Sequence, residues 1–131
     1  MAVNKRVTSI SMPAGTDLSA AQFRIVKMES DGQVALATDG ADPMIGILMN
    51  KPAAADRAAE VAIAGSEVKI EAGAALVTGD LVTAVAGGRG SAILGGTAAG
   101  TAYVVGVCTQ PAGASAAIGG VLVNPFKYLK A

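Results

Sequence analysis

The chain has 131 residues and no formal net charge, and 52% of its residues are hydrophobic while only 3% are aromatic. This length fits one domain, and no apolar run approaches the ~18 residues of a membrane-spanning helix. The chain lacks histidine and has one cysteine, which excludes His-based nucleophile pairs, His-containing zinc sites and intrachain disulfides. We therefore expect a soluble domain that is not an enzyme and that has no catalytic residue, metal, cofactor or small-molecule substrate.

Ten carboxylates remain as candidate acid–base groups, and all lie between Asp17 and Asp80. Most fall in predicted turns or on predicted solvent faces, whereas catalytic carboxylates need an enclosed pocket. The neutral total charge argues against nucleic-acid binding. Basic residues flank the acidic centre: Lys5, Arg6, Arg89, Lys127 and Lys130. Basic ends suit an acidic partner surface, although solvated lysines near frayed ends explain them equally well.

The first half of the chain alternates short β-branched runs with turn residues, as in all-β sandwiches and barrels. Residues 24–29 and 33–38 flank Asp31-Gly32 and are predicted to form a hairpin. After a turn at 39–43, residues 44–49 form the next predicted strand. Residues 53–60 have helical propensity, with a loop as the alternative.

In the second half, alternating apolar residues predict strands over 61–64 and 68–71, joined by Gly65-Ser66. A connector over 73–80 precedes predicted strands at 81–86, 103–108 and 120–123. The intervening segments are a tight turn at 87–90 and a Gly/Ala/Thr-rich stretch at 95–100. Asn124-Pro125 is predicted to end the last strand, and Cys108 is expected in the core. No internal repeat is evident.

We divide the chain into an N-terminal arm (1–14), a β-barrel core (15–123) and a C-terminal tail (124–131). The tail holds two of the four aromatic residues, interleaved with lysine, which is typical of an anchor that docks on another surface. The alternative is that the tail caps its own barrel. The predicted contact residues are Val3, Lys5, Arg6, Val7, Phe126, Lys127, Tyr128 and Leu129.

The order and spacing of these segments resemble the capsid decoration, or cement, proteins of tailed bacteriophages. The most specific part is a strand followed by Ala-Gly-x-x-x-x-x-Gly-Asp-x-Val, from Val68 to Val82. The other segments that carry the resemblance are residues 23–27, 32–37, 44–48, 51–55, 61–65, 87–90, 105–107 and 120–123. The C-terminal Phe/Tyr/Lys tail lies beyond the pattern.

The resemblance implies a single-domain β-barrel, β-tulip-like or jelly-roll-like fold with short terminal arms. It also implies a homotrimer, made in the host cytoplasm, that binds the outside of the expanded phage head and bridges major capsid subunits. The scarcity of aromatic residues predicts a thin core that subunit packing would support. The alternative function is a receptor- or glycan-binding β-domain of a virion fibre or cell surface.

Overall fold

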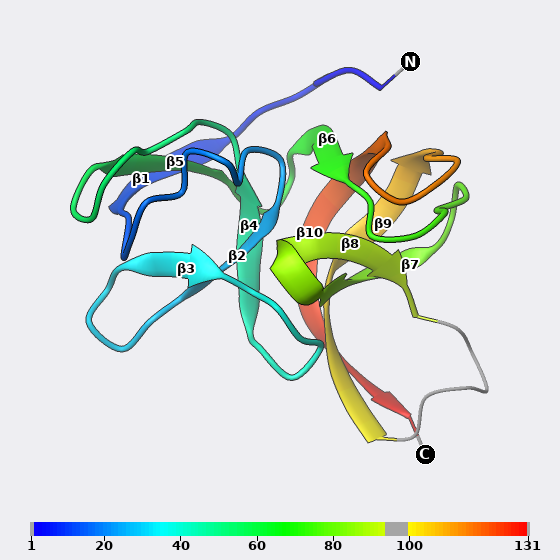
Figure 1. Ribbon diagram of the computed structural model, residues 1–131. Coiled ribbons are helices and arrows are strands. Elements are labelled where there is room, and N and C mark those ends of the chain that lie inside the picture. Colours follow the sequence, from blue (N-terminus) through cyan, green and yellow to red (C-terminus); the bar gives the residue numbers. More distant parts are fainter. Residues whose placement is uncertain (1, 94–99, 131) are drawn as a thin grey trace.

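The computed structural model describes residues 2–93 and 100–130, and β-strands supply nearly all of its regular structure (Figure 1). The strands of the first half are β1 Ser9–Pro13, β2 Ile25–Met28, β3 Val34–Leu36, β4 Met44–Leu48 and β5 Ala58–Ala62. Those of the second half are β6 Glu67–Glu71, β7 Leu81–Val85, β8 Arg89–Ala92, β9 Gly100–Gln110 and β10 Ile118–Lys130. A 3-10 turn, η1 Ala86–Gly88, joins β7 to β8.

The ten strands form two five-stranded sheets in which neighbouring strands are antiparallel. The first sheet has the order β1-β5-β4-β2-β3 and the second β6-β10-β9-β7-β8. The predicted all-β class is confirmed. The two sheets do not close into one barrel, and the architecture is broadly that of a β-sandwich.

The two sheets are copies of one unit, because each strand of the first corresponds to the strand five places later in the second. The strand pairing agrees residue by residue. Val26 pairs with Gly46 in the first repeat, and Val82 pairs with Gly106 in the second. At the other edge, Ser9 pairs with Ala62, and Glu67 pairs with Leu122. The chain therefore contains two copies of one structural unit, residues 9–63 and residues 67–123.

The loops repeat as well as the strands. The N–H of Leu18 donates to the carbonyl of Pro52, and that of Leu76 donates to Ala112. Asp56 and Ala116, at matching turns, both have φ of 67°. A short sequence match, Ala-Gly-x-x-Leu at 14–18 and 72–76, accompanies this correspondence.

The apolar residues pack in two cores: one lies within the first repeat, and the other combines residues of both repeats. The first core contains Ala14, Leu18, Val26, Leu48 and Val61. The matching residues of the second are Ala72, Leu76, Val82, Cys108 and Val121. Cys108 is fully buried, as predicted.

Polar contacts join the two repeats along their seam. The Glu71 carboxylate forms ion pairs with Arg24 of the first repeat, at 3.2 Å, and with Arg89 of its own. Arg24 also donates to the carbonyl of Gly87. The N–H of Tyr103 donates to the carbonyl of Gly40.

Both predicted arm boundaries are wrong. Residues 9–13 of the presumed arm form strand β1, paired with β5. Strand β10 does not end at Asn124-Pro125 but continues to Lys130, paired with β9. A register shift between Val123 and Phe126 lets the ladder continue across the proline, which has no N–H to donate.

Of the other predictions from sequence, some are confirmed and some are wrong. The hairpin around Asp31-Gly32 is confirmed as β2 and β3. The helix at 53–60 is wrong, because residues 58–60 belong to β5. Gly65-Ser66 does connect the two predicted strands, but these strands belong to different sheets. The Gly/Ala/Thr-rich stretch at 95–99 lies outside the described residues.

Candidate functional site

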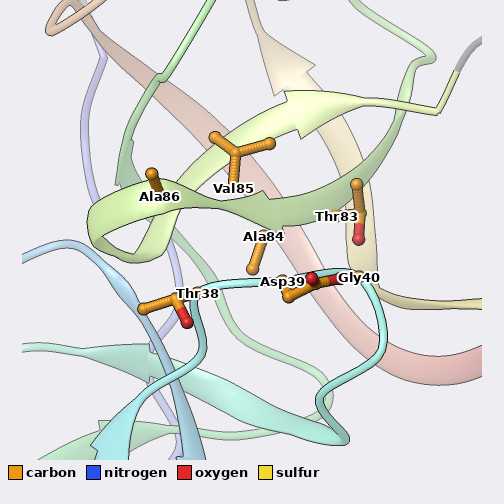
Figure 2. Close-up of a pocket in the computed structure, with 7 residues that line it drawn as sticks. All are labelled: Thr38, Asp39, Gly40, Thr83, Ala84, Val85 and Ala86. Carbon is orange, nitrogen blue, oxygen red and sulfur yellow. The ribbon is translucent and has the colours of Figure 1, made fainter.

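A shallow pocket of about 380 Å³ lies at the seam between the repeats and is open to solvent (Figure 2). Its lining comes from the turn at Thr38, Asp39 and Gly40 and from β7 and η1. Two polar side chains of the pocket take part in hydrogen bonds within the fold. Asp39 Oδ1 accepts the N–H of Ala41, and Thr83 Oγ1 donates to the carbonyl of Tyr103.

Two titratable groups outside the pocket have pKa values shifted by their surroundings. Hydrogen bonds from Ser19 lower the pKa of Asp17, a fully exposed turn residue. Burial raises the pKa of the Cys108 thiol, which keeps it protonated and unreactive at neutral pH. Within residues 2–93 and 100–130, no group of three or more acidic or cysteine side chains is arranged to hold a metal ion.

The predicted N-terminal contact residues lie along the edge of the second sheet. The N–H groups of Lys5 and Arg6 both donate to the carbonyl of Glu67, and Gln110 exchanges two hydrogen bonds with the backbone of Val3. The buried Ser66 hydroxyl bonds both the N–H and the carbonyl of Thr8. The arm is thus anchored to its own chain.

The side chains of this anchored arm point outward. Val3 and Val7 are 43% and 49% exposed. Lys5 Nζ lies 3.5 Å from the Glu67 carboxylate, but most of its side chain is in solvent. Apolar and basic groups therefore stand on a backbone that is held in place.

The predicted tail residues lie at the end of β10 that is far from the β9–β10 turn, where β10 pairs with the start of β9. Phe126 pairs with Val104, and Lys127 pairs with Tyr103. Phe126 is 38% exposed, and Lys127 Nζ lies 5.7 Å from the centre of the Tyr103 ring. The backbone of Tyr128 and Leu129 continues the strand, and their side chains lie outside the described part of the structure.

The structure does not bring the two predicted segments together. Val3 is held at Gln110, whereas Phe126 pairs with Val104, six residues earlier in β9. That separation corresponds to roughly 20 Å at about 3.3 Å per residue. Figure 1 shows the N-terminal arm and the far ends of β9 and β10, near the C-terminus, at opposite ends of the molecule.

Sequence analysis missed several exposed apolar side chains that belong to strands. Met28 is 48% exposed, Leu122 42% and Ile10 40%, and each lies on a sheet of the body. Ile10 went unnoticed because its segment was assigned to an arm. Leu122 was placed in a predicted strand at 120–123 to which no exposed face was assigned. Alternation along β10 predicts one outward face, and that signal would have found Leu122.

No family model matches the chain, and no curated protein is significantly similar to it in sequence. Among the described residues, no helix is long and apolar enough to cross a membrane.

Proposed function

We propose that the chain is a virion structural protein, a cement protein that binds major capsid subunits on the outside of an expanded phage head. The observation that carries this proposal is that the two predicted contact segments lie at opposite ends of one β-structure. A bridging protein needs two separate contact surfaces, and repeated weak contacts over a shell sum to strong retention.

The chemistry of the segments supports the same proposal. Phe126 and Lys127 present an exposed ring and an exposed charge on the paired far end of β10. The arm presents Val3, held by Gln110, and Val7, whose neighbour Thr8 is held by Ser66. Rigid apolar groups with few rotatable bonds lose little entropy on binding.

Co-sedimentation of the purified protein with expanded, undecorated capsids tests the proposal. We expect saturable binding together with a higher melting temperature of the decorated shell. Decoration of unexpanded shells serves as the comparison, because the binding site is proposed to form on expansion. Failure to bind a matched expanded capsid would reject the cement function. A glycan array would then test the receptor- or glycan-binding alternative.

A further inference from the structure

The first repeat has an apolar face that the second repeat covers. Ile25, Ile47 and Ala62 lie side by side on β2, β4 and β5, because Ile47 pairs with both of the others. All three are fully buried, and they pack in one apolar cluster with residues of the second repeat. We call these residues the Ile47 face.

The second repeat carries the same face without a comparable cover. The counterparts of the Ile47 face are Leu81, Val107 and Leu122, paired in the same way across β7, β9 and β10. Leu81 and Val107 are half-buried, and Leu122 is 42% exposed. These three residues form the Leu122 face.

The surface that covers the Ile47 face belongs to the second repeat, and its residues lie in the same apolar cluster. Val68, Ala84 and Val123 of the second repeat are at most 1% exposed. Val123 also exchanges backbone hydrogen bonds with Gly65 and Ser66, in the connector between the repeats, and β4 lies beside β10 (Figure 1). We call this surface the Val68 face.

The first repeat carries an uncovered version of the Val68 face. The counterparts are Ile10, Met28 and Ile63, which follow from the matching strand pairs. Ile10 is 40% exposed, Met28 is 48% exposed and Ile63 is half-buried. These residues form the Ile10 face. Each chain therefore presents both halves of a junction that it has already made once internally.

We infer that copies of this chain associate head to tail, the Leu122 face of one copy packing on the Ile10 face of the next. This contact repeats the junction between the two repeats. The inference deepens the self-assembly expected of a cement protein and does not require capsid binding. Contact between two unlike faces builds a ring if the rotation that relates one copy to the next closes on itself, and a filament if it does not. The homotrimer implied by the resemblance to cement proteins would then be a ring of six repeats.

The polar part of the internal junction is not reproduced on the free faces. The counterpart of Arg24 is Asp80, and the counterpart of Glu71 is Pro13, so the ion pair has no equivalent. Contact between copies therefore rests on apolar packing. We expect association that depends on protein concentration and changes little with salt.

Two single variants and their mixture test this arrangement by sedimentation velocity. Leu122→Asp removes one face and Ile10→Asp removes the other, and both side chains are exposed in the single chain. Each variant alone is expected to sediment as a monomer of 12.8 kDa under conditions where the unaltered chain forms a larger species. A 1:1 mixture retains one intact pair of faces and is expected to give a two-chain species.

The matched control is Ile118→Asp, on the same strand as Leu122. Ile118 is 38% exposed, and its counterpart, Ala58, is also exposed, so neither belongs to the junction. This variant is expected to assemble like the unaltered chain.

Leu122→Lys and Met28→Asp provide a second substitution for each face, and an unchanged melting curve of the isolated variant verifies folding. A monomeric unaltered chain at 100 µM (roughly a thousand times a tight Kd of 0.1 µM) overturns the inference. So does a mixture that stays monomeric, or an Ile10→Asp variant that still assembles, because these results indicate no contact or a contact between like faces.

Discussion

Gly46 and Gly106 occupy the same position in the two repeats, each with its α-carbon pressed against the neighbouring strand. A Cβ on Gly46 would overlap the carbonyl oxygen of Ala62, and one on Gly106 would overlap that of Leu122. Ala62 and Leu122 are themselves counterparts. The close approach of backbones between the fourth and fifth strands is thus built into the repeated unit.

Replacing either glycine with alanine is expected to destabilise the fold. The added methyl meets backbone atoms, which cannot rotate away, so the strands must separate. We expect Gly46→Ala and Gly106→Ala each to lower the free energy of unfolding by at least about 2 kcal/mol. Urea denaturation followed by circular dichroism measures the loss. Gly113→Ala, where a Cβ meets nothing within 4 Å, is the control and should change stability by less than about 0.5 kcal/mol.

The Glu71 carboxylate is expected to hold the two repeats in register. It pairs with Arg24 and Arg89, and the Glu71 and Arg24 side chains are 17% and 19% exposed. Glu71→Gln leaves two guanidinium groups without a charged partner at a half-buried seam. We expect a loss of about 1–3 kcal/mol in the free energy of unfolding.

A double-mutant cycle with Arg24→Met separates this coupling from the loss of either side chain alone. A coupling energy near zero would show that the Arg24–Glu71 pair does not contribute to stability.

Sequence patterns predicted the parts of this fold that depend on local chemistry. Asp31-Gly32 marks a tight hairpin because glycine at position 32 accepts a φ of 84°. The pattern failed where pairing partners are remote. Strand β1 is mostly exposed and mixes serine with apolar residues, and its pairing with β5 is set by the sheet.

The duplication was missed for a related reason. The repeats share backbone geometry with few identical side chains: Phe23, with φ of 67°, stands where the second repeat has Gly79, with φ of 97°. Their clearest shared run is Ala-Gly-x-x-Leu, and the other identities are isolated, such as Val26 with Val82 and Gly46 with Gly106. Sequence patterns indicated exposed residues near the two chain ends but missed Ile10 and Leu122, because these two lie on strands.

Cys108 is expected to be protected from thiol reagents in the folded protein. Its side chain is fully buried, and burial raises the pKa of its thiol above the ordinary 9.0. The folded state therefore favours the neutral thiol. This contribution to stability is complete below the pKa of the unfolded chain and is lost as the pH rises through the folded pKa.

We expect negligible labelling of the native chain by a disulfide reagent at pH 8 and stoichiometric labelling in denaturant. In an Ile118→Cys variant, the exposed second thiol should react at once. Rapid labelling of Cys108 in the unaltered native chain would contradict its burial.

The β9–β10 hairpin supplies the last prediction, on capsid binding. Phe126 is exposed, and Lys127 is exposed beside the Tyr103 ring. Phe126→Ser removes the apolar contact without opening a core. Lys127→Glu reverses the charge presented to an acidic partner surface. We expect each to weaken co-sedimentation with expanded capsids by about tenfold or more, the loss typical of a central contact residue, while the melting temperature of the free protein changes little.

Matched controls separate this loss from general effects of charge or polarity. Ile118→Ser removes an equally exposed apolar residue from the same strand, and Lys51→Glu reverses an exposed charge in the first repeat. Both should bind capsids normally. If all four variants bind alike, the hairpin is not the capsid contact. A loss confined to Lys127→Glu, sensitive to ionic strength, would instead show that charge dominates over apolar packing at this end of the molecule.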